Sequence, residues 1–440
     1  MTFVNLLMNV FLLIFLIIGL YVNFSNIYFL FITFFGFKKA KKDYEMLEDE
    51  TRFLILVAAH NEEDVIASTI ENLKKIDYDP NLFDLYIVND NSTDQTGAIC
   101  QTMGVKHINT DEQLFPREGT GKPAGLQYAL RFLGFDDLVN RYDCLLILDA
   151  DNHVDPWILK ELNSQYIQKN KPEAIQTYLD SKNSTNTLSL GYAIGYAYTN
   201  RFFQLAKYRL GLPNAIGGTG FIVRMDYLMK HGGFSFRSLT EDLELEMQIV
   251  KDNGRVLWNH FARIYDEKPE NLKISIKQRT RWAQGHWFVA FTSFPPFMKK
   301  LVMEKGRIKV IDQLFYLFSM GRAVNLLIAL LGIILWTIFG VILADSTMVF
   351  DNMKALSAII FGSSLFTLGV FIYQYYFCLR YAIKADTKYK FRFIKMTISI
   401  VYYGYTYLYA QIIGLFKWRK QNVWVKTKHS KTAIDHKAQK

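Results

Sequence analysis

The sequence contains little cysteine and, over long stretches, no charged residue. Its three cysteines have unrelated spacings, which excludes a cysteine-based metal cluster and fits a reducing compartment: Cys100, Cys144 and Cys378. Asp, Glu, Lys and Arg are absent from residues 1–37, 323–344, 355–379 and 396–416. Because about 20 apolar residues suffice to cross a bilayer, these four stretches exclude a wholly soluble protein.

The chain between the first two of these stretches is too polar to lie in lipid. Residues 38–287 therefore predict a globular domain, which excludes an all-membrane transporter. Residues 1–37 lack the basic start and small-residue cleavage site of a signal peptide, so we expect a transmembrane anchor. Four lysines follow the anchor: Lys38, Lys39, Lys41 and Lys42. By the positive-inside rule we therefore expect a multi-pass plasma-membrane protein whose globular domain is cytoplasmic.

The formal net charge of +10 does not indicate a nucleic-acid-binding surface. The basic excess lies beside the apolar stretches, where such clusters set membrane topology and contact anionic lipids. We therefore expect membrane lipids, and no nucleic acid, as partners of these residues: Arg380, Lys384, Lys388, Lys390, Arg392, Lys395, Lys417, Arg419, Lys420, Lys426 and Lys428.

Short apolar runs alternate with amphipathic stretches in the globular domain. Phe53–Ala58, Leu85–Val88 and Leu145–Leu148 predict strands, and 62–75 and 93–103 predict helices, a pattern typical of a parallel α/β sheet. Ligands of such sheets bind at the carboxyl ends of the strands. Those ends are polar and acidic here: Ala59-His60-Asn61-Glu62, Asn89-Asp90-Asn91-Ser92-Thr93-Asp94 and Asp149-Ala150-Asp151.

Two glycine-rich segments fail to complete a nucleotide-binding motif. Near Gly121-Lys122, the phosphate-loop pattern requires Gly where Pro116 stands and Ser or Thr where Pro123 stands. In Gly217-Gly218-Thr219-Gly220, the dinucleotide fingerprint lacks its third glycine because Val223 occupies that place. Neither a P-loop nor a Rossmann signature is therefore present.

Three other clusters have residue types suited to sugar-nucleotide chemistry. Asp149-x-Asp151 suits Mg²⁺ or Mn²⁺ completed by substrate phosphates, although an isolated Asp-x-Asp is also common in turns. Asp242 begins a helix-like run, where an acidic residue also favours the helix dipole. Gln278, Arg281 and Trp282 fall on one face of a predicted helix. The guanidinium of Arg281 suits pyrophosphate, and the indole of Trp282 suits a sugar ring. The alternative is a basic helix at the membrane interface.

Taken in order, these motifs resemble membrane-integrated glycosyltransferase family 2, which includes cellulose synthase, hyaluronan synthase and poly-N-acetylglucosamine synthase. The resemblance covers about Phe53 to Trp287. It implies an α/β GT-A domain inserted between N-terminal and C-terminal transmembrane helices. The matching positions are Asn61-Glu62, Asp90, Gly121-Lys122-Pro123, Asp149-x-Asp151, Thr240-Glu241-Asp242 and Gln278-x-x-Arg281-Trp282.

The resemblance also implies a role for each matching residue. Asp242 would be the catalytic base, and Asp149 and Asp151 would bind Mg²⁺ or Mn²⁺. The UDP of the donor would be bound by Glu62, Asp90, Lys122, Asp149, Asp151 and Arg281. The acceptor would be bound by Glu241, Gln278 and Trp282.

The expected reaction is direct displacement at the anomeric carbon of a UDP-sugar. One base together with a metal and a cationic clamp suffices, so the transfer inverts configuration and yields a β-linked product. A glycoside hydrolase would instead pair two carboxylates across the bond. We expect a processive synthase that builds and exports a β-linked polysaccharide from UDP-glucose or UDP-N-acetylglucosamine. The alternative is transfer of one sugar to a lipid or lipid-linked acceptor.

The C-terminal third is expected to hold both interfacial and transmembrane helices. Residues 288–309 are aromatic-rich and end in lysines, which predicts an interfacial helix. Within 310–416, the tyrosine-rich stretch 396–416 has basic residues at both ends, which favours an interfacial helix over a further crossing. The crossing remains the alternative.

The basic tail, 417–440, is expected in the cytoplasm. It resembles the gating loop of the larger synthases at Trp424, Thr427 and Lys428. The chain has fewer expected spans than those synthases, so a homodimer or an accessory subunit would be needed to complete a channel.

Overall fold

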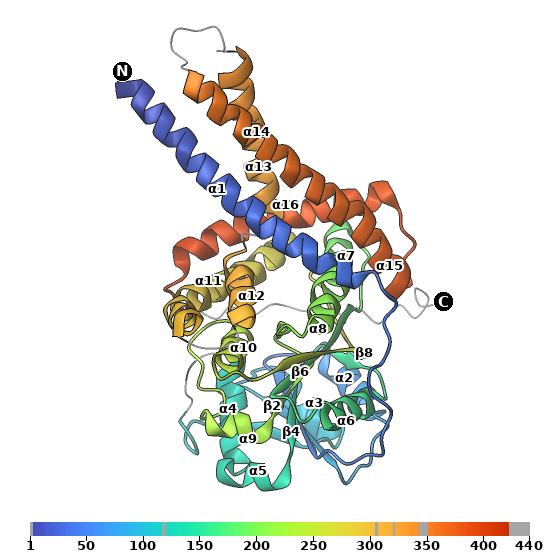
Figure 1. Cartoon of the computed structure of the whole chain (residues 1–440). Coiled ribbons are helices and arrows are strands. Elements are labelled where there is room, and N and C mark those ends of the chain that lie inside the picture. The colour runs from blue at the N-terminus through green and yellow to red at the C-terminus, as the bar shows by residue number, and fades with distance from the viewer. Residues whose placement is uncertain are drawn as a thin grey trace.

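The computed structural model describes residues 3–116, 119, 121–303, 307–319, 322–342 and 351–421. Figure 1 shows an α/β domain at one end of the molecule and a group of long helices at the other. Further helices, among them α7, α11 and α16, lie between these two parts. The predicted gating residues Trp424, Thr427 and Lys428 lie outside the described residues.

The domain is built on an eight-stranded sheet with strand order β3-β2-β1-β4-β7-β6-β8-β5. Four strands are mutually parallel: β1 (Phe53–Ala59), β2 (Phe83–Asn89), β3 (His107–Asn109) and β4 (Cys144–Asp149). The others are β5 (His153–Val154), β6 (Ala174–Ser181), β7 (Phe221–Arg224) and β8 (Val256–Asp266). β7 runs antiparallel to both β4 and β6, so the sheet is mixed and the expectation of a parallel sheet was wrong beyond β4. Four residues are too few for an alternating pattern to reveal β7 in the sequence.

The three predicted strands are confirmed as β1, β2 and β4, each longer than predicted by one to three residues. Successive side chains of β1 enter opposite faces of the sheet, Ile55 with one hydrophobic core and Leu56 with the other. The predicted helices are shorter than expected, as α2 (Ile66–Leu73) and α3 (Thr96–Thr102). The residues before α2 and α3 form the loops at the carboxyl ends of β1 and β2.

The other helices of the domain follow the strands in the order of a layered α/β fold. They are α4 (Lys122–Phe132), η2 (Phe135–Asp137), α5 (Leu138–Arg141), α6 (Ile158–Gln168), α7 (Thr187–Thr199), η3 (Asn200–Leu205), α8 (Ala206–Arg209), α9 (Met225–Lys230) and α10 (Glu241–Lys251). One further short helix, η1 (Phe34–Gly36), precedes the first strand. α7, η3 and α8 form one continuous helical segment between β6 and β7. This segment lies between the sheet and the long helices (Figure 1).

Three described segments are long and apolar enough to cross a membrane: Leu6–Gly36, Val324–Ile342 and Asn352–Asp386. They contain α1 (Phe3–Thr33), α13 (Arg322–Trp336) with η4 (Thr337–Ile342), and α14 (Asp351–Ile372) with η5 (Tyr373–Leu379) and α15 (Arg380–Asp386). The fourth charge-free stretch lies in α16 (Phe393–Lys417), which is not among these candidate spans. Figure 1 shows α16 running across the direction of α1 and α14.

The expected boundary between residues 287 and 288 falls inside one long helix, α11 (Leu272–Met303). Pro295 and Pro296 lie within it, and α12 (Arg307–Phe318) follows. Buried side chains of α11, including Trp287 and Phe297, pack in one hydrophobic cluster with Leu243 of α10. The aromatic residues after 287 therefore continue a helix that packs against α10.

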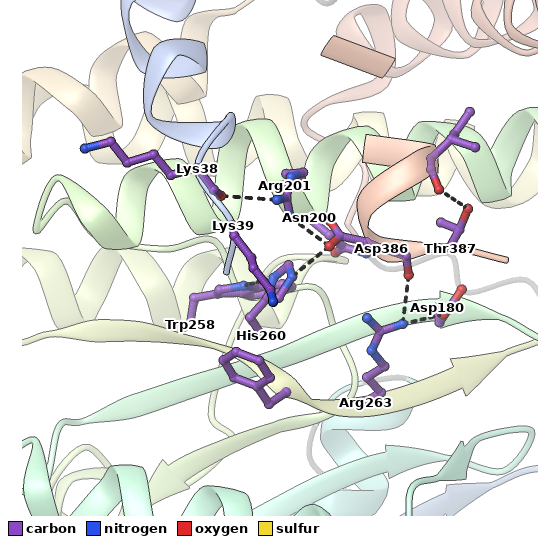
Figure 2. A network of polar contacts seen from close by, with 12 residues as sticks. Lys38, Lys39, Asp180, Asn200, Arg201, Trp258, His260, Arg263, Asp386 and Thr387 are labelled. Atoms are coloured by element: carbon purple, nitrogen blue, oxygen red, sulfur yellow. Dashed lines mark hydrogen bonds and ion pairs between the residues drawn. The ribbon is translucent and has the colours of Figure 1, made fainter. Parts of the chain in front are cut away.

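Buried ion pairs fasten the candidate spans to the α/β domain (Figure 2). Arg201 of η3 donates to both carboxylate oxygens of Asp386, at 2.7 and 2.9 Å, and also donates to the carbonyl of Lys38 at 3.2 Å. His260 of β8 lies 3.2 Å from Asp386 Oδ1, and Arg263 donates to the Asp386 carbonyl at 3.1 Å. The ends of the first and third candidate spans are thus held at one surface of the domain.

A second buried contact joins the first span to the domain through α12. Lys207 of α8 lies 2.8 Å from Asp312 of α12, and both side chains are almost fully buried. Tyr28 of α1 donates a hydrogen bond to the other oxygen of the same carboxylate, at 2.5 Å. The orientation of α1 is therefore tied to the elements that surround the carboxyl end of the sheet.

Candidate active site

A cavity of about 670 Å³ opens at the carboxyl ends of β1, β2 and β4. Ten predicted site residues come from separate parts of the chain, and all of them line it: Glu62, Asp90, Lys122, Asp149, Asp151, Glu241, Asp242, Gln278, Arg281 and Trp282. The volume lies in the range usual for small-molecule sites. The structure therefore brings the described motifs together, while their individual roles remain predictions.

Glu62 and Asp90 lie in the loops that follow β1 and β2. Asp90 is 6% exposed, and its Oδ1 accepts a hydrogen bond from Thr110 Oγ1 at 3.2 Å. The Glu62 backbone N–H donates to Thr96 Oγ1 at 2.8 Å, which fixes this loop against α3. Asp94, in contrast, accepts from both the backbone and the hydroxyl of Thr96, so it serves as a local helix cap.

The two carboxylates that follow β4 have different surroundings. Asp149 forms an ion pair with Lys122, the first residue of α4, and Lys122 also donates to the Gly218 carbonyl at 2.7 Å. Asp151 is 5% exposed, and its Oδ2 accepts from the backbone N–H of Glu267 at 3.0 Å. Asp149 is thus the more accessible of the two, whereas Asp151 is held in place by the end of β8.

Glu241 and Asp242 begin α10 and face the cavity from the side opposite β4. Gly218 approaches this helix start closely, because a Cβ added there would lie 3.2 Å from Asp242 Oδ2. Its φ of +79° also favours glycine. The loop before β7 therefore reaches both Lys122 and Asp242 and closes the cavity between them.

Burial raises the pKa of both carboxyl groups at the start of α10. Burial, and then the charge of Asp242, raises the pKa of Glu241 to about 7. Burial also raises the pKa of Asp242, while its helix N–H groups and the charges of Lys122 and Arg281 oppose the rise. A raised pKa is what a carboxylate base needs near neutral pH. The nearby cations favour the ionised form of Asp242.

The end of the cavity nearest the candidate spans is lined by aromatic rings. Trp282 of α11 is accompanied by four tyrosines from α7, α12 and α16, namely Tyr192, Tyr196, Tyr316 and Tyr407. Gln278 and Arg281 lie on the same face of α11 as Trp282. Among the described residues, Gln278 Oε1 and Arg281 Nε are buried without a hydrogen-bond partner.

The charge balance of the cavity favours a divalent cation. Among the described lining residues, eight carboxylates face three Lys and Arg side chains. A nucleoside diphosphate would add further negative charge, which such a site tolerates only with a cation. The described residues contain no cluster of three or more His, Cys, Asp or Glu for a metal. Two carboxylates with substrate phosphates and water are the donor set that Mg²⁺ and Mn²⁺ accept, so Asp149 and Asp151 fit this group.

Several lining residues were missed in the sequence. Asp266 ends β8, Glu267 and Lys268 follow it, and burial raises the pKa of Asp266 to about 6 against the opposing charge of Lys268. The rule that ligands meet strand ends could have found them, because the alternating stretch Ala262-Arg263-Ile264-Tyr265 precedes Asp266. The tyrosines of α7, α12 and α16 carried no such signal, since their meeting depends on how distant helices pack.

Comparison with known proteins assigns the chain to a protein family. Residues 51–285 match the family model described as Glycosyltransferase like family 2. The chain is 27% identical over 277 residues to the probable glycosyltransferase YdaM of Bacillus subtilis (strain 168), covering 62% of this chain and 63% of that protein. It is 24% identical over 275 residues to a poly-beta-1,6-N-acetyl-D-glucosamine synthase of Staphylococcus aureus (strain MSSA476), covering 62% and 64%.

A relative of a different kind is the beta-monoglucosyldiacylglycerol synthase of Nostoc sp. (strain PCC 7120 / SAG 25.82 / UTEX 2576). It is 24% identical over 266 residues, covering 60% of this chain and 55% of that protein. The chain therefore spans less than two thirds of the length of each of these relatives.

Among solved structures, the fold resembles the mannosyltransferase PcManGT from Pyrobaculum calidifontis in complex with GDP-Man and Mn²⁺. The TM-score is 0.54 at 14% identity, with 94% of this chain and 99% of that chain covered. This likeness concerns the fold, and it agrees with the expected GT-A domain between N-terminal and C-terminal helices. The chain belongs to glycosyltransferase family 2 and has a GT-A fold.

Proposed function

We propose that the protein transfers a sugar from a UDP-sugar, with inversion, to a growing β-linked polysaccharide at the cell membrane. UDP-glucose and UDP-N-acetylglucosamine are the proposed donors. The observation that carries this proposal is a single cavity with two different ends. One end combines carboxylates with Lys122 and Arg281, and the other presents aromatic rings beside the candidate spans. Ring faces suit the apolar faces of sugar residues.

Asp242 is proposed as the base because it lies between the two ends. Its carboxylate would accept the proton of the acceptor hydroxyl while that oxygen bonds to the anomeric carbon. The bond from the anomeric carbon to UDP breaks in the same step, and the electron pair leaves with UDP. Glu241 and Gln278 would orient the acceptor, and Trp282 would stack beneath it. Because one base acts from one side, the configuration inverts.

The donor end would hold UDP through charge and hydrogen bonding. Glu62 and Asp90 are proposed to contact the uridine, and Lys122 and Arg281 the phosphates. A guanidinium pairs well with phosphate oxygens. Asp149 and Asp151 are proposed to hold Mg²⁺ or Mn²⁺, which when bound would neutralise charge on the departing diphosphate.

The second candidate function is transfer of one sugar to a lipid or lipid-linked acceptor. It is favoured by the position of the aromatic end directly beside the candidate spans. Only three such spans occur in the described residues, so a polysaccharide channel would need a homodimer or an accessory subunit. The relatives include both a glucolipid synthase and a polysaccharide synthase.

We propose a plasma-membrane location with the α/β domain in the cytoplasm and α16 at the membrane interface. Residues 38 and 386 are held at the same surface of the domain, which fits one hairpin of α13 and α14 beside α1. The tail, 417–440, would then also be cytoplasmic. A cysteine introduced at position 430 should be protected from an impermeant thiol reagent in whole cells and labelled after lysis. Labelling of intact cells would refute this topology.

The function is tested with purified protein in nanodiscs, a panel of UDP-sugars, and Mg²⁺ or Mn²⁺. Release of UDP identifies the donor, and sizing of the product distinguishes the two functions. A ladder or a long polymer supports the synthase, whereas a single addition to lipid supports the second candidate. Absence of transfer from every UDP-sugar, in the presence of both metals and both acceptor classes, would refute the proposal.

A further inference from the structure

α16 has two faces with different surroundings. Its outer face is apolar and open, with Tyr405 73% exposed and Tyr409 55% exposed. Its inner face packs on α7 and α11 and includes Tyr407, which lines the cavity. One helix near the C-terminus therefore presents an apolar surface outward and an active-site side chain inward.

The inner face of α16 packs closely against α7 and α11. A Cβ added to Gly191 of α7 would lie 2.6 Å from the Ser399 carbonyl oxygen. A Cβ added to Gly414 of α16 would lie 2.6 Å from the Cβ of Ala283 in α11. These close approaches at both ends of α16 fix its register against α7 and α11. The position of Tyr407 follows from that register.

Arg279 of α11 binds the turn of α16 that carries Tyr407. Its side chain is fully buried, Nη1 donates to the Tyr403 carbonyl at 2.9 Å, and Nη2 donates to Thr406 Oγ1 at 2.8 Å. The guanidinium also lies over three tyrosine rings, with centroids 5.4, 5.0 and 5.7 Å away for Tyr192, Tyr403 and Tyr407. Arg279 itself does not line the cavity.

The charge of Arg279 has no carboxylate partner among the described residues. A buried cation without such a partner is costly, and it is retained here by three hydrogen bonds and three ring faces. One hydrogen bond goes to the Ser275 carbonyl of the same helix, and the other five contacts lead to α7 or α16. Arg279 therefore holds together the helices that line the aromatic end of the cavity.

We infer that α16 forms one wall of the acceptor subsite, with Tyr407 contacting a β-linked glycan and Arg279 positioning that tyrosine. This inference rests on the proposed function of the cavity. In α11, Gln278 and Trp282 face the acceptor from one side, while Arg279 on another side of the helix holds α16. The acceptor subsite is thus complete only when α16 is docked.

The test measures glycan binding and transfer separately. The probes are β-linked tetrasaccharides of glucose and of N-acetylglucosamine, with 1,4 and 1,6 linkages, titrated by calorimetry into the full chain in nanodiscs. Tyr407→Ala should raise the Kd and the acceptor KM about three- to tenfold, and Tyr407→Phe should restore both because the ring is kept. Tyr405→Ala, a tyrosine on the outer face of the same helix, is the matched control and should bind as the wild type does.

Arg279→Lys tests the positioning role, since an ammonium cannot make both hydrogen bonds to α16 from one planar group. It should raise the glycan Kd and acceptor KM while leaving UDP affinity within about twofold, because Arg279 does not line the donor end. An equal loss of UDP affinity would overturn the positioning role.

Wild-type Kd and KM in Tyr407→Ala would overturn the subsite, as would a wild-type protein that binds none of the tetrasaccharides. A failure of the proposed function is distinct, because it appears as absence of transfer from any UDP-sugar. The glycan Kd values decide the inference in either case.

Discussion

The protonation of Glu246 tests whether the buried carboxylates beside the active site outnumber the buried cations. Glu246 lies on α10, one turn after Asp242, and its Oε2 accepts the backbone N–H of Ile216 at 3.1 Å. The nearby Lys207 is already paired with Asp312. One buried lysine cannot neutralise two buried carboxylates, so the second one takes up a proton. Burial accordingly raises the pKa of Glu246 to about 8, against the opposing charge of Lys207.

This raised pKa makes folding stability depend on pH. The ordinary value is 4.5, so between pH 4.5 and about 8 the folded state binds more protons than the unfolded state. The contribution of Glu246 to the free energy of unfolding is therefore fully present below pH 4.5 and is lost as the pH rises towards 8. At about 1.4 kcal/mol per pH unit, the loss due to Glu246 is on the order of 5 kcal/mol over this window.

The perturbation is Glu246→Gln, which keeps the shape of the side chain and removes its titration. Thermal unfolding of wild type and variant in the same detergent, from pH 5 to 9, isolates the contribution of Glu246. Other groups with a raised pKa, such as Glu241 and Asp266, are present in both proteins, so their contributions cancel in the difference between the two stabilities. The variant should gain stability relative to wild type as the pH rises. Parallel curves would refute the reasoning, and Glu71→Gln, at an exposed position of α2, should give such parallel curves.

Three further predictions concern the base, the metal and the membrane attachment. Asp242→Asn should lower turnover at least about a hundredfold with UDP affinity unchanged by titration, and wild-type kcat/KM should fall as the pH drops through the raised pKa of Asp242. EDTA should abolish UDP release, and Asp149→Asn should increase the Mn²⁺ concentration needed for half-maximal activity. Asp386→Ala should lower the free energy of unfolding by about 3–5 kcal/mol, because it leaves the buried Arg201 without its carboxylate partner. Asp43 belongs to an ion pair at the surface, so Asp43→Ala should lower it by less than about 1 kcal/mol in the same denaturation assay.

Much of the donor end could be predicted because local sequence determines it. An apolar run that ends in Asp149-Ala150-Asp151 places carboxylates at a strand end whatever the rest of the chain does. The same rule would have included Asp266. The mixed direction of the sheet could not be predicted in this way, because β7 is short and its pairing with β4 depends on the path of α7, η3 and α8.

The sequence by itself determined the charge-free stretches, the order of the motifs and the acidic strand ends, because each is a property of neighbouring residues. Only the tertiary structure decided that Tyr407 of α16 and Trp282 of α11 line one cavity, and that Asp386 pairs with Arg201. Both arrangements bring together residues more than 100 positions apart, and they depend on helix packing and buried ion pairs. Periodicity along the chain contains no information about either.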